Sequence, residues 1–305
     1  MLVGFLILPQ CENLQKDLES KSIVKVCGAY DSMSAKLVEL YGFDAVWAGS
    51  FAISATHNVP DASILTMTEF FTAASNMAHA CEIPVIADCD TGYGDATNVR
   101  YMVKKYESAG IAGICIEDKT FPKQNSLLEG GSNQLLSEKD FAAKILAANE
   151  AKQNKAFTVI ARIEALISGM GIKHALKRAY AYEKAGADLI LIHSKKITPE
   201  EIFEFADSWK GNAPLVVIPT TYYSVNVDEL IEHKIKMVIY ANQTLRAAHL
   251  ALSKLLKQMK DANNMSQLQN QMSSMDDIFK LQEMYDIKSQ EKDIEEKLRK
   301  LGYIS

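Results

Sequence analysis

The stretch PVIADCDTGYGDATNVRYMVKKYESAGIAGICIE, residues 84–117, contains one strand-helix-strand unit. The apolar run Pro84–Ala87 predicts a buried strand, and the pattern over Asn98–Ala109 predicts a helix that ends at Gly110. The apolar run Gly113–Ile116 then predicts the next strand. Because both strands are almost continuously apolar, we expect them to run parallel in a sheet that is covered on both faces.

The same unit recurs through most of the chain. Runs of strand composition lie at Ile23–Ala29, Ala45–Ala48, Pro84–Ala87, Gly113–Ile116, Phe157–Ile163, Leu189–Ile192, Leu215–Ile218 and Met237–Tyr240. Helical patterns lie at Ser34–Tyr41, Thr66–Ala80, Asn98–Ala109, Glu138–Gln153, Gly171–Ala185, Pro199–Trp209, Val227–His233 and Gln243–Met259. This alternation predicts an α/β protein with a closed (β/α)8 barrel of the TIM type, and an open doubly wound sheet is the alternative.

The composition is that of a globular protein without a strong affinity for polyanions. Of the 305 residues 48% are hydrophobic and 23% are charged, and a chain of this length can remove roughly 75% of its unfolded surface from water. Lys plus Arg total 33 against 38 Asp plus Glu, for a net charge of -5. No basic stretch is dense enough to neutralise a run of phosphates, so we expect no nucleic-acid partner.

The N-terminus and the cysteines indicate an intracellular setting. The apolar run Leu2–Leu8 is too short to span a bilayer, lacks a basic flank, and is followed by Cys11 and Glu12 rather than a small-residue cleavage site. We therefore expect no membrane segment and a cytoplasmic protein. The five cysteines are odd in number and form no C-x-x-C pair, which argues against a disulfide framework or structural zinc and favours buried, reduced thiols.

The C-terminal part differs from the barrel in composition. After Lys260 a polar connector, residues 261–267, precedes amphipathic segments at Met275–Tyr285 and Ser289–Leu301. The apolar side chains of this helical tail need a surface to cover, either on the same chain or on a neighbouring subunit.

The third strand of the predicted barrel ends in two carboxylates. Active sites of such barrels are built at the C-terminal ends of the strands, where Asp88 and Asp90 stand. Strand alternation would turn both to the same side, and Gly92 and Gly94 would let the backbone turn closely around a ligand. Oxygen ligands suit Mg²⁺ better than Zn²⁺. The alternative is a solvated acidic loop that caps a helix.

The next three strand ends add further polar groups. Glu117 is a third acidic residue, and the long connection Thr120–Leu136, with its Gly130–Gly131 pair, has the composition of a mobile lid or of a plain surface loop. Arg162 suits either a structural ion pair or a planar donor to a phosphoryl or carboxylate group. His193 by itself is more typical of a wall residue than of a base. Together these groups fit a small anionic substrate bridged by Mg²⁺.

Two motifs resemble a known superfamily. Residues 88–94 (DCDTGYG) are similar to the D-x-D-T-G-Y-G stretch of the isocitrate lyase and phosphoenolpyruvate mutase superfamily, and residues 117–126 match the E-D-K-x(5)-N-S signature of phosphoenolpyruvate mutases. Arg162–Ala165 is among the supporting matches. The resemblance extends over roughly Asn13–Tyr303, so it implies an N-terminal extension at 1–12, a catalytic barrel at 13–260 and a helical tail at 261–305.

The resemblance implies an activity and an assembly. The activity is interconversion of phosphoenolpyruvate and 3-phosphonopyruvate with Mg²⁺ as cofactor, a step that makes a carbon-phosphorus bond for phosphonate biosynthesis. The assembly is a homotetramer, a dimer of dimers in which the last barrel helix is exchanged between subunits.

The resemblance also implies roles for individual residues. Asp88 would bind Mg²⁺ directly, with Asp90 and Glu117 acting largely through waters. Asp61 would help to position the site. The residues implied around the phosphoryl group are Arg162, Lys123, Asn125, Ser126 and His193, and those implied at the pyruvyl end are Trp47 and the following amides of Gly49 and Ser50.

The chain departs from its relatives at two places. It reads Trp47-Ala48-Gly49-Ser50 where relatives often have W-x-S-G or W-x-S-S, so the amide contacts are carried over but no hydroxyl at Gly49. Thr221 stands where many relatives have Lys. Neither departure removes a proposed metal ligand.

Four other functions are weighed against the mutase. Phosphonopyruvate hydrolases tend to have Thr at the position of Asn125, so Asn favours the mutase. Carbon-carbon lyases use a Cys in a K-[KR]-C-G-H loop, but this chain has no Cys after Cys115. Oxaloacetate hydrolysis is a less favoured alternative, and a non-catalytic barrel is expected to have lost some of the acidic and Arg residues. In the mutase we expect the lid, Thr120–Leu136, to be mobile without substrate, its polar side chains gaining partners only from a phosphoryl group.

Overall fold

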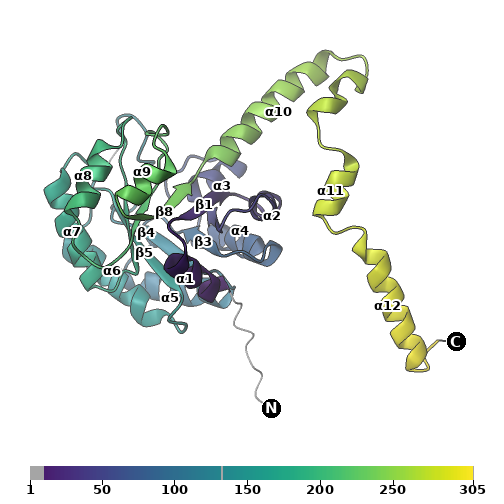
Figure 1. Cartoon of the computed structure of the whole chain (residues 1–305), viewed down its shortest axis with the longest axis horizontal. Helices are drawn as coiled ribbons and strands as arrows, with labels where there is room; N and C mark the ends of the chain where they lie inside the picture. The colour runs from purple at the N-terminus through teal and green to yellow at the C-terminus, as the bar shows by residue number, and fades with distance from the viewer. Residues whose placement is uncertain (1–9, 132, 305) are drawn as a thin grey trace. The chain divides into compact units, whose positions relative to one another are not determined.

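Eight parallel strands form the centre of the protein. The computed structural model describes residues 10–131 and 133–304. Its strands form a closed barrel in chain order (Figure 1). They are β1 (Val24–Ala29), β2 (Ala45–Ala48), β3 (Val85–Asp88), β4 (Gly113–Glu117), β5 (Thr158–Ile163), β6 (Leu189–Ile192), β7 (Leu215–Val217) and β8 (Ile235–Tyr240).

The helices that precede β8 connect the strands and cover the outside of the barrel. Those of the first part are α1 (Gln10–Ser20), α2 (Ser32–Leu40), α3 (Ser50–Thr56), α4 (Met67–Ala80), α5 (Ala96–Ser108), α6 (Glu138–Ala151), α7 (Ile172–Lys184), α8 (Glu200–Ser208) and α9 (Val227–Glu232). The remaining ones are α10 (Gln243–Asp261), the 3-10 helix η1 (Ser266–Gln271), α11 (Met275–Leu281) and α12 (Asp286–Lys300). Every predicted strand and helix is present, whereas α1, α3 and η1 were not predicted.

Pairing between the first and last strands closes the barrel. Val24 of β1 pairs with Met237 of β8, and Cys27 pairs with Tyr240. The (β/α)8 prediction is therefore confirmed, and the open-sheet alternative is wrong. Parallel pairing in register also places Glu117 of β4 beside Arg162 of β5, so neighbouring strands deliver opposite charges to one end of the barrel.

The core is apolar on both sides of the sheet. Each of the first six strands buries at least three of its residues, as expected for a parallel sheet covered on both faces. All five cysteines are free and buried, which confirms the prediction of reduced interior thiols. The helices that follow the site strands have defined starts: Asp95 accepts hydrogen bonds from the amides of Thr97 and Asn98, and Ser137 accepts one from the amide of Asp140.

The helix α1 begins inside the segment that was predicted to be an extension. Gln10 Nε2 donates to the carbonyls of Ala78 and Cys81, each at 3.1 Å, and Leu14 is fully buried. Residues 10–12 are therefore part of a helix that packs on the barrel, while residues 1–9 of the predicted extension lie outside the described residues.

The contacts divide the chain into two compact units, residues 1–245 and 246–305. The division falls within α10, whereas the predicted barrel domain runs to residue 260. In α10 no residue is buried, and Leu250, Leu252 and Leu256 are all exposed. Exchange of this helix between subunits stays a prediction.

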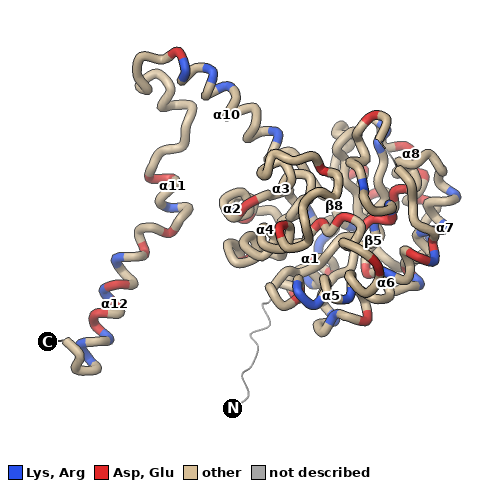
Figure 2. The backbone as a smooth tube through the Cα atoms, turned by 180° about the vertical axis from the view of Figure 1, so that it is seen from behind, with Lys and Arg blue, Asp and Glu red and all other residues tan. Residues whose placement is uncertain are grey.

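Charge is mixed along the surface rather than segregated. In Figure 2 acidic and basic positions alternate along α12 and are interspersed over the barrel. Within residues 10–131 and 133–304, no helix is long and apolar enough to cross a membrane.

Candidate active site

The side chains predicted for the site meet at the C-terminal ends of the strands. One group is centred on Asp61. Lys123 Nζ lies 2.6 Å from Asp61 Oδ1 and 3.1 Å from Asp90 Oδ1, and Asn125 Nδ2 donates to Asp61 Oδ2 at 2.7 Å. Both oxygens of Asp61 are thus engaged by the lid, although more than sixty residues separate these partners in sequence.

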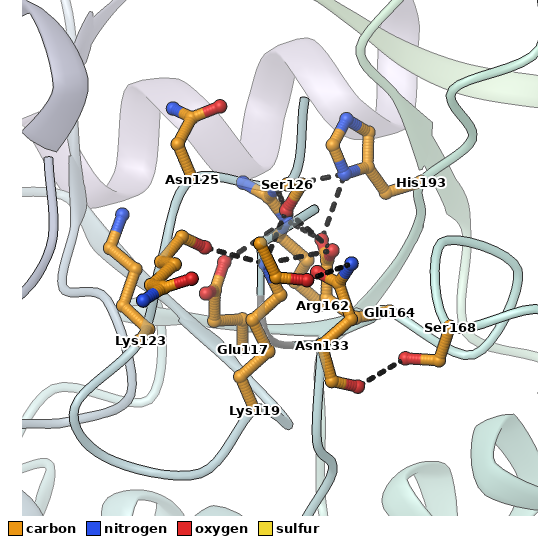
Figure 3. A network of polar contacts seen from close by, with 12 residues as sticks. Glu117, Lys119, Lys123, Asn125, Ser126, Asn133, Arg162, Glu164, Ser168 and His193 are labelled. Carbon is orange, nitrogen blue, oxygen red and sulfur yellow. Dashed lines mark hydrogen bonds and ion pairs between the residues drawn. The ribbon is translucent and has the colours of Figure 1, made fainter. Parts of the chain in front are cut away.

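A second group is centred on Glu164 (Figure 3). Arg162 Nε donates to Glu164 Oε1 at 2.5 Å, and Ser126 Oγ donates to Glu164 Oε2 at 2.6 Å. Arg162 Nη2 donates to His193 Nδ1 at 2.8 Å, and this nitrogen lies at the same distance from Glu164 Oε1. Arg162 Nε also lies 3.4 Å from Glu117 Oε2. The arginine is therefore held in one orientation by two carboxylates.

Lys119 links this second group to the start of the lid. Its side chain is 1% exposed, and Nζ donates to the carbonyl of Gln124 at 2.8 Å and to Ser126 Oγ at 2.7 Å. The same ammonium lies 3.7 Å from Glu164 Oε2. A buried lysine costs free energy unless its charge and its N–H donors are satisfied. Here two oxygens of the lid accept its hydrogen bonds, and the carboxylate of Glu164 balances its charge.

The metal-binding candidates lie on and just beyond β3. Asp88 ends the strand, and Asp90 stands in the following turn with φ of 49°. Because β3 ends at Asp88, the strand alternation that was predicted to orient both carboxylates does not extend to Asp90. Asp88 Oδ2 accepts a hydrogen bond from Ser50 Oγ at 2.9 Å, and Asp88 Oδ1 accepts one from the amide of Asp90 at 3.3 Å.

The lid is closed over these groups. The amide of Thr120 donates to the carbonyl of Gln134, and the amide of Leu136 donates to the carbonyl of Asp118, each at 2.9 Å. Lys123 and Ser126 are each only 6% exposed. The expectation that the lid side chains find partners only in the presence of a phosphoryl group is wrong, because carboxylates of the barrel already bind them.

Burial and charge shift the pKa values of the acidic groups in opposite directions. Burial raises the pKa of Asp90 to about 6 and that of Glu117 to about 7, against the opposing charges of Lys123 and Arg162 respectively. For Glu164 burial is outweighed chiefly by the charge of Arg162, which holds its pKa well below the usual range. Lys123 and Arg162 therefore only partly offset the effect of burial on Asp90 and Glu117, whereas the positive charge beside Glu164 outweighs it.

Burial and neighbouring charges also shift the pKa values of Lys123 and His193. Burial alone would lower the pKa of Lys123, but the charges of Asp90 and Asp61 outweigh it and raise the value. Burial and the nearby Arg162 lower the pKa of His193, so the imidazole is neutral at pH 7. A neutral ring that accepts a hydrogen bond from Arg162 fits the wall residue that the sequence predicts.

The donor set fits a hard divalent cation. Glu117 Oε1 is buried without a hydrogen bond, and Asp90 Oδ1 has only the ion pair with Lys123. The five carboxylates of the two groups and β3 face three cationic side chains. One divalent cation would neutralise this excess. Among residues 10–131 and 133–304, no three acidic, His or Cys side chains converge closely enough to enclose an ion, so waters would complete its coordination.

The predicted pyruvyl end lies beside Trp47. This side chain is 1% exposed, and a Cβ atom added to Gly49 would stand 3.0 and 3.1 Å from two atoms of its indole ring. A side chain at Gly49 would therefore crowd Trp47. Thr221 lies elsewhere, where it lines a cavity of about 510 Å³ together with Lys195 and residues 126–131 of the lid.

Sequence reasoning assigned no role to Lys119 or Glu164. Lys119 lies in the E-D-K motif and Glu164 lies in Arg162–Ala165, so their places in these motifs could have identified them as site residues. It also missed the buried group beneath the lid, in which Asp118 Oδ2 accepts hydrogen bonds from Arg178 Nη1 at 2.9 Å and from the Tyr182 hydroxyl at 2.8 Å.

The fold and the site define a (β/α)8 barrel with a charged, lid-covered site at the C-terminal strand ends. A family model described as phosphoenolpyruvate phosphomutase matches residues 14–260. The chain belongs to this family, and it is therefore an enzyme of the phosphoenolpyruvate mutase and isocitrate lyase superfamily.

Relatives with two different activities resemble the chain equally well. It is 41% identical over 270 residues to a phosphonopyruvate hydrolase of Variovorax sp. (strain Pal2), covering 88% of this chain and 93% of that protein. A phosphoenolpyruvate phosphomutase from Streptomyces platensis subsp. rosaceus superposes with a TM-score of 0.91 at 42% identity, covering 93% and 98%. A phosphonopyruvate hydrolase in complex with oxalate and Mg²⁺ superposes with a TM-score of 0.86 at 38% identity, covering 92% and 97%.

Proposed function

We propose that this enzyme is a phosphoenolpyruvate mutase, an isomerase that interconverts phosphoenolpyruvate and 3-phosphonopyruvate for phosphonate biosynthesis. In the forward direction the bond between phosphorus and the enol oxygen breaks, and a bond between phosphorus and C3 of the resulting enolate forms. No water enters the reaction and none is released. The active site must therefore hold the phosphoryl group while keeping water away from it.

The engagement of Asp61 carries the choice of a mutase over a hydrolase. Its two carboxylate oxygens each accept a hydrogen bond, from Lys123 and from Asn125, so each has one fewer lone pair to offer to an attacking water. Glu164 is likewise surrounded by donors from Arg162 and Ser126. Asn125 also supports the mutase because related hydrolases tend to have Thr there.

The side chains around the phosphoryl group are suited to confinement. A loose, metaphosphate-like transition state requires positioned positive charge and donors more than a strong base. Arg162 and Lys123 supply fixed charge, and Asn125 and Ser126 supply polar groups that can guide the migrating phosphorus between oxygen and carbon. His193 orients Arg162 through the hydrogen bond to its Nη2 atom.

Mg²⁺ is the proposed cofactor, bound directly by Asp88 and through waters by Asp90 and Glu117. When bound, it supplies positive charge to the oxygens of the pyruvyl enolate. The free oxygen of Glu117 and the excess of carboxylates support this assignment, as does the Mg²⁺ of the related hydrolase structure. Trp47 and the amides of Gly49 and Ser50 are proposed to line the pyruvyl end.

The proposal includes the assembly and the location that the resemblance implies. We propose a cytoplasmic homotetramer in which α10 packs on a neighbouring subunit, an arrangement that the exposed leucines of this helix support. A small-molecule substrate is the only other proposed partner.

Phosphorus NMR of the purified protein tests the function. With phosphonopyruvate and Mg²⁺ the mutase produces phosphoenolpyruvate, whereas a hydrolase produces inorganic phosphate. A matched sample with excess chelator should show no turnover. Phosphate as the main product would replace the proposal with the hydrolase, and acetate and oxalate formed from oxaloacetate would indicate the oxaloacetate hydrolase.

A further inference from the structure

Ser50 is buried beside the metal-binding candidates. It is the first residue of α3 and is 1% exposed. Ala48 of β2 pairs with Ala87 of β3, so the chain that leaves β2 brings Ser50 next to Asp88 at the end of the neighbouring strand. The position of the hydroxyl therefore follows from the strand register, not from a flexible loop.

The Ser50 hydroxyl contacts one oxygen of Asp88, and the backbone holds the other. Ser50 Oγ donates to Asp88 Oδ2 at 2.9 Å, and the amide of Asp90 donates to Asp88 Oδ1 at 3.3 Å. The second bond is long, so the hydroxyl is the stronger of the two constraints on the carboxylate plane. Since a hydroxyl has one proton to donate, Ser50 has none left for a substrate oxygen.

A side chain one position earlier could not take the place of Ser50, because a side chain at Gly49 would meet the Trp47 ring.

We propose that Ser50 is a positioning residue for the cation site, whose hydroxyl holds the Asp88 carboxylate in the orientation that binds a divalent ion. The inference rests on the metal assignment made under the proposed function. Loss of a group that hydrogen-bonds to a metal ligand without contacting the metal typically lowers the metal affinity about 10- to 100-fold. In this role the Ser50 hydroxyl acts on the cation through Asp88.

Binding of Mn²⁺ to the substrate-free protein tests this role. Free Mn²⁺ is measured by electron paramagnetic resonance during a titration of the wild type, Ser50→Ala and Ser54→Ala. Ser54 lies one turn along α3 and is also buried, so it is a matched control. We expect the Kd for Mn²⁺ to rise about 10- to 100-fold in Ser50→Ala and to change less than about two-fold in Ser54→Ala.

A kinetic measurement separates positioning from damage to the fold. In Ser50→Ala the Mg²⁺ concentration for half-maximal activity should rise by the same factor, and saturating Mg²⁺ should restore most of kcat. A lower kcat with an unchanged Mg²⁺ requirement, or an unchanged Kd for Mn²⁺, would overturn the proposal. Because the Mn²⁺ titration uses no substrate, its outcome is independent of whether phosphorus NMR finds phosphoenolpyruvate or phosphate.

Discussion

Arg162 is the residue on which most of the site depends. Its guanidinium donates from Nε to Glu164 and from Nη2 to His193, and Glu117 is also close. A planar fork can satisfy such divergent partners, whereas a single ammonium cannot. The carboxylates of Glu164 and Glu117 therefore balance the charge of the Arg162 guanidinium and also fix the direction of its remaining N–H donors.

Replacing Arg162 by Lys should lower kcat by about 100- to 1,000-fold, the usual loss when one preorganised donor to developing charge is removed. Steady-state kinetics with phosphonopyruvate measures the effect. The charge is retained, so KM should change much less than kcat. A raised KM with a normal kcat would instead show that Arg162 binds the substrate and the transition state equally strongly.

Asn125 is expected to control the fate of the phosphoryl group. Asn125→Ala removes the donor to Asp61 Oδ2 and leaves that buried oxygen free to accept a proton from water. We expect mutase turnover to fall at least about ten-fold, the weight of one polar contact to a charged group. Product analysis by phosphorus NMR should show more inorganic phosphate relative to phosphoenolpyruvate. Normal turnover without phosphate would contradict the role of Asn125.

At the scale of elements, the lid is fastened at both ends. Near its start, Lys119, just after β4, donates to the carbonyl of Gln124 and to Ser126 Oγ. At its end, Arg178, which is paired with Asp118, donates from Nη2 to the carbonyl of Leu136 at 2.9 Å. The middle of the lid exposes Leu127 and Leu128. Opening therefore requires the contacts of Lys123 and Asn125 with Asp61, and that of Ser126 with Glu164, to break.

Lys119→Met should loosen the lid without unfolding the barrel. The methionine fills similar space but leaves Ser126 and the carbonyl of Gln124 without the ammonium. We expect faster protease cleavage within Thr120–Leu136, and a smaller protective effect of phosphonopyruvate with Mg²⁺. Lys139→Met, at an exposed position of α6, is the control. Equal cleavage rates in all three proteins would show that Lys119 does not hold the lid.

Arg178 and Asp118 form a buried ion pair whose separation should be costly. Arg178→Met leaves the fully buried Asp118 carboxylate without its cationic partner and should lower the free energy of unfolding by about 3–5 kcal/mol. Urea denaturation followed by circular dichroism measures this loss. The double variant Asp118→Asn with Arg178→Met should lose less, because no uncompensated charge remains. A double variant that is less stable than Arg178→Met would contradict this explanation.

At the scale of the whole molecule, α10 exposes three leucines. Leu250, Leu252 and Leu256 are 70%, 57% and 60% exposed, a large apolar area for one helix to leave in water. The implied helix exchange between subunits would cover them.

Leu256→Glu should therefore weaken the oligomer. Sedimentation velocity at several protein concentrations should show a shift from tetramer toward smaller species, because a carboxylate would be buried in the interface. Lys257→Glu changes the charge at the adjacent exposed position and serves as the control. A monomeric wild type, or an unchanged tetramer in Leu256→Glu, would argue against an interface on this face.

The local pattern of side chains determined the barrel and the place of the site. Apolar runs such as Gly113–Ile116 can be recognised in the sequence because a strand that is buried on both faces has an apolar side chain at nearly every position. Polar groups that directly follow such a run must lie at the end of the strand. Asp88, Glu117 and Arg162 were found in this way. The motifs E-D-K-x(5)-N-S and D-x-D-T-G-Y-G then named the family.

Only the tertiary structure decided which charges meet. Lys123 and Asn125 share Asp61, Lys119 reaches Glu164, and Ser50 reaches Asp88, across separations that no local pattern specifies. A buried charge is stable only beside its partner, and the partner is selected by strand register and by the closure of β8 on β1. For this reason the sequence by itself identified the acidic and basic groups, while the barrel determined that the lid is closed and that both oxygens of Asp61 accept hydrogen bonds from it.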